Sequence, residues 1–168
     1  MPSSTDDITA AVDPDTIAHF FTAIEKGDAE AVRSFITTNK SLTQVRHKSV
    51  QWKYDMDIEM DAYKFLGAYL GQLTGLQLSL LKGHDRIAHD IIDATLDTSD
   101  LDLENGGGNT ALHMATFLGA RDIVRRLLER GCNAARKNAK GFKPMDVLDD
   151  EEMRKIYSSA DISLNNAE

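Results

Sequence analysis

Cysteine and long apolar runs are scarce in this chain of 168 residues. Its single cysteine, Cys132, excludes an internal disulfide and a zinc site built from several cysteines. No apolar run approaches the roughly 20 residues that a membrane-spanning helix needs. The first residues, MPSSTDDITA, lack the basic and apolar regions of a signal peptide. We therefore expect a protein of the cytoplasm, the nucleus or both, with no membrane partner.

An excess of positive charge is also missing. The chain has 27 acidic and 19 basic residues, which gives a formal net charge of −8. Because phosphate binding needs a basic surface, no direct nucleic-acid partner is expected. Apolar and charged fractions of 42% and 27% are those of a globular protein, and the length indicates one domain.

The most specific pattern present is GNTALHMATFLGARDIVRRLLERGCNAARKNAKG, from Gly108 to Gly141, a step of 141 − 108 = 33 residues. It resembles the ankyrin repeat, because residues 110–113 stand where that family has Thr-Pro-Leu-His. Gly119 matches the end of the family's first helix, and residues 131–133 match its Gly-Ala-Asp. The resemblance implies a helix-turn-helix unit with a β-turn finger, which stabilises itself by stacking on neighbouring units.

Three weaker copies surround this repeat. Residues 74–84 keep the spacing, but Gln77 replaces the family's histidine, a departure that we expect to weaken hydrogen bonding between repeats. Residues 19–36 and 141–157 resemble the two capping repeats, and about three residues are extra in the 95–100 connection. The resemblance implies an all-α ankyrin-repeat solenoid of two internal repeats between two caps.

The predicted organisation covers the whole chain. A flexible N-terminal tail (1–12) and a C-terminal tail (160–168) flank an ankyrin-repeat domain at 13–159. Within it we place an N-cap repeat (13–46), an insertion (47–73), two repeats (74–107 and 108–140) and a C-cap repeat (141–159).

The insertion contains a strictly alternating stretch, VQWKYDMDIEMD, at residues 50–61. Its even positions are apolar and its odd positions polar: Val50, Trp52, Tyr54, Met56, Ile58 and Met60 against Gln51, Lys53, Asp55, Asp57, Glu59 and Asp61. This alternation predicts a strand with one apolar and one solvated face, in an enlarged β-like first finger. A helical pattern at 61–73 could cover the apolar face.

Two interpretations of the apolar face are open. In one, it forms a small satellite core over the repeats, since large apolar patches are uncommon on soluble monomers. In the other, it is a binding edge whose acids, Asp55, Asp57, Glu59 and Asp61, favour a basic partner segment.

The ankyrin resemblance also implies a concave binding surface made of fingers and first helices. The candidate residues there are Asn109, Phe117, Leu118, Lys140 and Phe142, together with Leu81, Lys82, Asn105 and Ala139. Large apolar side chains at Phe117, Leu118 and Phe142 are the expected anchors.

The charged residues are unevenly spread along the predicted repeats. Acids predominate from Asp85 to Glu104, and bases predominate from Arg121 to Lys143. Stacking of the second helices could pair the two groups across neighbouring repeats, or they could form an electrostatic partner surface.

No residue pattern indicates catalysis, a cofactor or a metal. We interpret residues 106–108, three glycines, as a turn, His113 as a fixing point for a helix start and Cys132 as a packing residue. The predicted function is a non-catalytic protein-binding module, used as an adaptor, scaffold or regulatory subunit. The alternative is an acidic escort for a basic client, such as a ribosomal or histone-like protein.

Overall fold

The computed structural model describes residues 12–166, with side chains described to residue 161. The helices and strands, in chain order, are α2 (Pro14–Lys26), α3 (Ala29–Thr38), the 3-10 helix η1 (Lys40–Gln44), β1 (Arg46–His47), α4 (Glu59–Phe65), β2 (Leu73–Thr74), α5 (Gly75–Leu81), α6 (Asp85–Ala94), α7 (Thr98–Leu101), α8 (Ala111–Phe117), α9 (Arg121–Glu129), the 3-10 helix η2 (Pro144–Val147) and α10 (Glu151–Asn166).

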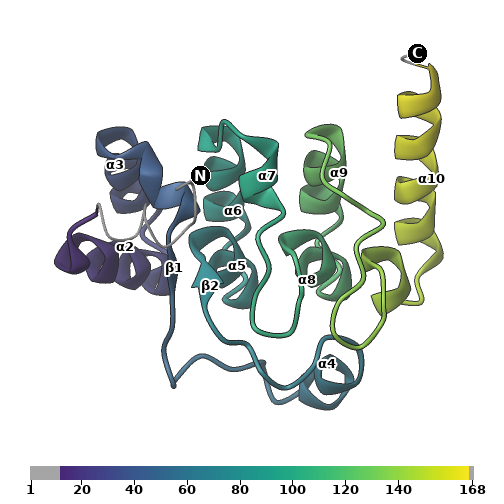
Figure 1. The fold of residues 1–168 in the computed structure, drawn as a ribbon, viewed down its shortest axis with the longest axis horizontal. Coiled ribbons are helices and arrows are strands. Elements are labelled where there is room, and N and C mark those ends of the chain that lie inside the picture. Colours follow the sequence, from purple (N-terminus) through teal and green to yellow (C-terminus); the bar gives the residue numbers. More distant parts are fainter. Residues whose placement is uncertain (1–11, 167–168) are drawn as a thin grey trace, which may run out of the picture.

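The helices stack as successive pairs in the order of the sequence. α2 and α3, α5 and α6, α8 and α9, and finally η2 and α10 stand next to one another along the long axis (Figure 1). First helices contact first helices, from α2 through α5 and α8 to η2, and second helices contact second helices. The predicted all-α ankyrin-type solenoid is confirmed.

Local side-chain caps decide where the first helices start. At α8, the hydroxyl of Thr110 accepts from the backbone N–H of His113, and His113 Nδ1 accepts from the N–H of Thr110. At α5, Thr74 and Gln77 form the same reciprocal pair, at 3.0 and 3.1 Å. Each such cap satisfies backbone donors that a helix start leaves unpaired.

Gln77 also bonds to the next repeat, which corrects the expectation that it weakens this contact. Its Nε2 donates to the carbonyl of Leu103 at 2.7 Å, much as His113 Nε2 lies 2.9 Å from the carbonyl of Phe142. A glutamine amide supplies the same donor at nearly the same reach, so the expectation of a weakened contact is wrong.

The core lies between the two layers of helices. The second helices α6 and α9 bury equivalent positions: Ile87, Ala88, Ile91 and Ile92 in α6, and Ile123, Val124, Leu127 and Leu128 in α9. Burial of each large aliphatic side chain contributes about 1.5–3 kcal/mol. The stacking of one helix pair on the next is therefore the main source of stability.

Some predicted charge pairs across the stacked helices are present. Arg126 on α9 donates to Asp93 on α6 at 2.6 Å. Asp90 turns the other way and pairs with Arg33 on α3 at 3.3 Å, while Arg130 donates to two backbone carbonyls at the end of α6. These pairs are largely exposed, so each contributes about 0–1 kcal/mol.

The ends of the chain differ from the expected tails. Of the predicted N-terminal tail only Val12 is described, and its side chain is buried; residues 1–11 lie outside the described part. At the other end α10 remains helical to Asn166, well past residue 160 (Figure 1). The 95–100 connection, where about three extra residues are expected, leads into the short helix α7.

The strand predicted at residues 50–61 is wrong. Residues 50–58 form turns and irregular chain, and Glu59 begins the helix α4. Backbone bonds from Trp52 N to Ser49 O and from Ile58 N to Asp55 O close two of these turns. Strand pairing at the base of the insertion is limited to β1 and β2, which are antiparallel and two residues long. Because no strand of the described chain pairs with residues 50–61, the alternation is not converted into a sheet.

Candidate protein-binding site

The first half of the insertion is anchored on the N-terminal helix pair by Trp52. Its indole stacks on Phe21 at 5.8 Å between ring centroids, lies 5.7 Å from the ring of His47, and donates a hydrogen bond to the Glu25 carboxylate. Tyr54 is also buried. These two aromatic residues are buried, as the satellite-core interpretation expects, so they are not available as partner contacts. Met56 and Met60, which that interpretation also places in the core, are exposed.

The second half of the insertion lies along the fingertips of the following repeats, with α4 beneath α8 and η2 (Figure 1). The side-chain amide of Asn109 donates to the carbonyl of Leu66, and that of Asn138 donates to the carbonyl of Phe65, both at 2.8 Å. The Phe65 ring packs against Phe142 at 5.3 Å. Hydrogen bonds and aromatic packing therefore fasten the insertion to both C-terminal fingers.

This contact changes the status of the predicted concave-face residues. Asn109 is fully buried, and Phe142 is half-buried against the insertion, so both bind this chain's own backbone or side chains. Phe117 and Leu118 are half-buried on the end of α8, and Lys140 is exposed at a fingertip. The insertion thus covers part of the surface that the ankyrin resemblance offered to a partner.

Sequence reasoning missed Asn138 and Phe65, and it placed Leu66 only in the helical pattern at 61–73. A repeat signal was present, because Asn105 and Asn138 are 138 − 105 = 33 residues apart. The side-chain oxygen of each accepts hydrogen bonds from backbone N–H groups two and four residues later. Their contacts with the insertion could not be read from the spacing.

The outer side of the insertion remains open to solvent. Met56 and Met60 are 81% and 85% exposed, whereas Ile58 is half-buried. Asp55, Asp57 and Asp61 are exposed, and Glu59 is half-buried and accepts from the Tyr63 hydroxyl at 2.5 Å. We call Asp55, Met56, Asp57, Glu59, Met60 and Asp61 the insertion surface. Within the described residues, none of its four carboxylates lies in an ion pair.

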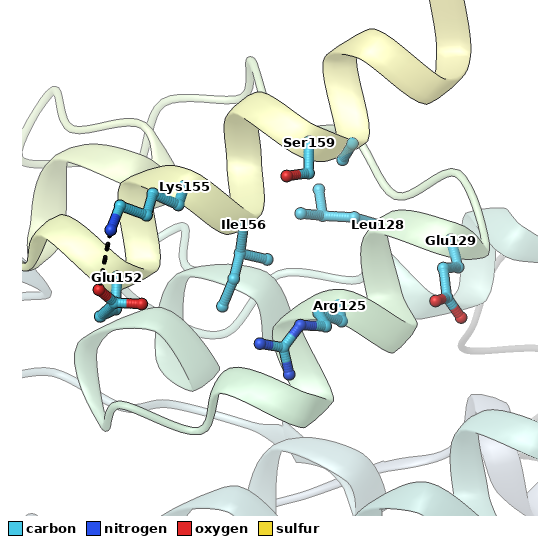
Figure 2. A pocket seen from close by; sticks show the side chains of 8 residues that line it. Arg125, Leu128, Glu129, Glu152, Lys155, Ile156 and Ser159 are labelled. Atoms are coloured by element: carbon cyan, nitrogen blue, oxygen red, sulfur yellow. Dashed lines mark hydrogen bonds and ion pairs between the residues drawn. The ribbon is translucent and has the colours of Figure 1, made fainter.

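A groove between α9 and α10 has a volume of about 450 Å³ (Figure 2). Its apolar part comes from Leu128, Ile156 and Ala160. Its charged lining is of both signs, with Arg125 and Lys155 against Glu129 and Glu152, and Lys155 pairs with Glu152 at 3.0 Å. A surface of mixed, partly paired charge does not select a partner by charge.

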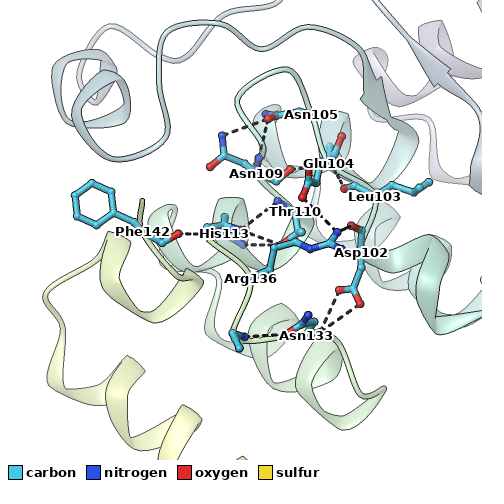
Figure 3. Close-up of polar contacts among 12 residues, drawn as sticks. Asp102, Leu103, Glu104, Asn105, Asn109, Thr110, His113, Asn133, Arg136 and Phe142 are labelled. Atoms are coloured by element: carbon cyan, nitrogen blue, oxygen red, sulfur yellow. Dashed lines mark hydrogen bonds and ion pairs between the residues drawn. The ribbon is translucent and has the colours of Figure 1, made fainter. Parts of the chain in front are cut away.

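Polar side chains of neighbouring fingers contact one another (Figure 3). The backbone N–H of Asn133 donates to Asp102, and Arg136 pairs with Glu104 at 3.3 Å. His113 is fully buried, and this burial lowers the pKa of its imidazole. These groups have a structural role, because their hydrogen bonds and ion pairs join one finger to the next. The sequence predicted such a role for His113.

Cys132 is buried, as expected for a packing residue, and burial raises the pKa of its thiol to about 12. Within the described part of the chain, no three His, Cys, Asp or Glu side chains are grouped so that they could hold a metal ion. None of the helices described there has the length and apolar character to cross a membrane.

The comparisons with known proteins agree with this geometry. The family model of the ankyrin repeat matches residues 107–139. Residues 107–139 are therefore an ankyrin repeat, and the helix pairs on either side stack on it in the same way. No curated protein sequence matches it.

A solved structure with a similar fold is the crystal structure of the yeast ribosomal protein Rps3 in complex with its chaperone Yar1. The match covers 88% of this chain and 92% of that chain, with a TM-score of 0.62 and 17% sequence identity. At this identity the likeness shows a shared fold.

Proposed function

We propose that this chain is a non-catalytic protein-binding module of the cytoplasm or nucleus, and that its partner docks a basic segment on the insertion surface. Ankyrin repeats mediate protein–protein interaction, which supports the general class. The observation that carries the finer proposal is the charge of residues 55–61, where four acids occur without a base and without an ion-pair partner in the described structure. Lysine or arginine side chains would neutralise this surface.

The two methionines add an apolar component to the same surface. Met56 and Met60 are among the most exposed large apolar side chains described. Methionine side chains are flexible and polarisable, and they adapt to partners of different shape. A segment that alternates basic and apolar residues therefore fits better than a purely basic one.

The insertion is also held in place before a partner arrives. Trp52 anchors one end, and the amides of Asn109 and Asn138 hold the backbone at the end of α4. A surface that is already ordered loses less conformational entropy on binding. This favours recognition by the insertion as a preformed surface.

A second candidate, an escort for a basic client, is favoured by the likeness to the chaperone complex. An escort would cover a basic surface of its client until assembly, and the acidic insertion surface suits that task. An adaptor held mainly by apolar contacts is the competing possibility. The two differ in their response to salt, because only charge-dominated binding is strongly screened.

The test measures binding of two probes by fluorescence anisotropy: purified ribosomal protein Rps3 and a synthetic peptide of alternating lysine and leucine. The variant Asp55→Asn/Asp57→Asn/Asp61→Asn removes three charges with little change in shape. The control Asp15→Asn/Glu30→Gln/Asp161→Asn removes three exposed acids elsewhere. With up to about 1 kcal/mol for each exposed pair, the first variant should bind at least one probe about tenfold to a hundredfold more weakly.

The control should bind within about twofold of the parent, since its changes lie away from the insertion surface. Raising the salt from 50 to 500 mM should weaken the parent in the same direction as the three asparagine substitutions. Binding that withstands both the substitutions and the salt would contradict docking on the acidic surface. Absence of binding to both probes would contradict the preference for basic segments.

A further inference from the structure

A second pocket lies at the fingertips, where strand β1 meets the turn before α8. Its volume is about 340 Å³. Its lining comes from three separate segments: Arg46 and Lys48, then Tyr69, Gly71 and Gln72 at the end of the insertion, and Glu104, Asn105 and Gly106 of the finger. The insertion surface described above contributes no residue to it.

Asn105 lines this pocket and has an unused, buried hydrogen-bond donor. Its side chain is only 7% exposed, and its Oδ1 accepts from the backbone N–H groups of Gly107 and Asn109 and from the amide of Asn109, at 2.9 to 3.2 Å. Three donors around one atom identify that atom as the oxygen, so the orientation of the amide is determined. The Nδ2 of Asn105 has no hydrogen-bond partner among the described residues.

Arg46 and Lys48 bring positive charge to the same place. The Nε of Arg46 is buried and also lacks a hydrogen-bond partner in the described part of the chain. Lys48 is exposed, and its Nζ lies 3.4 Å from the hydroxyl of Tyr69. Among the described residues, neither base lies within ion-pair distance of a carboxylate. Glu104, the acid in the lining, pairs with Arg136 at 3.3 Å.

These groups form a cluster of hydrogen-bond donors. Two of them, the Nε of Arg46 and the Nδ2 of Asn105, have no acceptor among the described residues. Arginine, lysine and an amide of fixed orientation in the lining of one pocket match the oxygens of a carboxylate or phosphate. In a chain of net charge −8, a local excess of positive charge opposes the overall field and needs a separate reason. The glycine turn does not act as a phosphate cradle, because the N–H groups of Gly106, Gly107 and Gly108 all bond within the fold.

We propose that this pocket binds an oxyanion, a carboxylate or a phosphate group, with Arg46 and Lys48 supplying charge and Asn105 Nδ2 a directed donor. The Nε of Arg46 and the Nδ2 of Asn105 are closed to solvent and have no partner among the described residues, so a small shift of these side chains toward bound oxygens would satisfy both donors. The site is independent of the proposed docking of a basic segment, so either proposal can fail alone.

The test is a titration of the ¹⁵N-labelled chain with sodium phosphate and, separately, sodium acetate, at constant ionic strength. The shifts of the Asn105 side-chain amide and the Arg46 Nε–H signal should move and saturate for at least one anion. Saturation by phosphate alone would assign a phosphate source, and saturation by acetate would assign a carboxylate source. Shifts that stay linear for both anions would mean that the pocket holds only water, which would overturn the proposal.

Two variants remove the donors. Asn105→Asp keeps an oxygen for the backbone donors of Gly107 and Asn109 but replaces the donor with a negative charge. Arg46→Gln removes the guanidinium, and Arg86→Gln, at an exposed arginine outside the pocket, is its matched control. Both pocket variants should weaken binding at least tenfold, and the control should not. If Asn105→Asp unfolds, Lys48→Gln beside the control Lys82→Gln replaces it. Equal binding by pocket and control variants would refute the site.

Discussion

Replacing Trp52 with alanine removes the side chain that joins the insertion to the first helix pair. The indole is 7% exposed, stacks on Phe21 and contacts His47, and it donates to Glu25. Truncation of a buried aromatic residue to alanine costs about 3–5 kcal/mol. For a chain of this size each kcal/mol lowers the Tm by about 2–4 °C. We therefore expect Trp52→Ala to lower the Tm by about 6–20 °C.

The matched variant is Met56→Gln/Met60→Gln, which alters residues of the same alternating stretch. Both side chains are more than 80% exposed, and exposed substitutions change the free energy of unfolding by about 0.5 kcal/mol or less. Its Tm should therefore stay within about 2 °C per substitution of the parent value. Circular dichroism at 222 nm during heating measures both variants. An unchanged Tm for Trp52→Ala, or an equal loss for the methionine variant, would refute this assignment of core and surface.

Three further variants or reactions test the repeats themselves. Burial lowers the pKa of His113 below its ordinary 6.5, so as the pH falls below about 6.5 the unfolded chain takes up a proton first and stability is lost. In His113→Gln, which copies the cap of Gln77, the free energy of unfolding in urea should therefore change less between pH 7.5 and 5.5 than in the parent. An unchanged pH dependence would contradict this. Because burial raises the pKa of the Cys132 thiol to about 12, its reaction with a thiol reagent at pH 8 should be slow in the folded protein and fast in 6 M guanidinium, about the concentration that unfolds even very stable domains. Gly71→Ala should lower the free energy of unfolding in urea more than Gly83→Ala. Both glycines have positive φ, but a Cβ at position 71 would lie 2.8 Å from the backbone of the opposing finger, whereas the space at position 83 is open.

The repeat at residues 108–140 was predictable because its signals are local. Thr110 and His113 cap one helix start, and the apolar stripe of α9 repeats at helical spacing. These features depend on residues a few positions apart, which the sequence displays directly. The role of Gln77 was harder to judge, since its value depends on whether its amide reaches the carbonyl of Leu103 in the next repeat.

The secondary structure of the insertion, and which of its side chains are buried, could not be predicted in the same way. Alternation at residues 50–61 favours a strand only if a second strand lies alongside, and pairing between strands is not a local property. In the structure Trp52 and Met56, two even positions of one pattern, have opposite environments. Which of them is buried depends on the path of the chain, which is set by contacts with α2 and with the fingers.

The sequence by itself determined the stacked helix pairs, their caps and the acidic character of residues 55–61. Each of these depends on residue type and short spacing. Only the tertiary structure decided that Asn109 and Phe142 serve the insertion, and that Arg46, Lys48 and Asn105 meet at one pocket. Those outcomes depend on contacts between residues tens of positions apart, whose geometry exists only once the helix pairs have stacked.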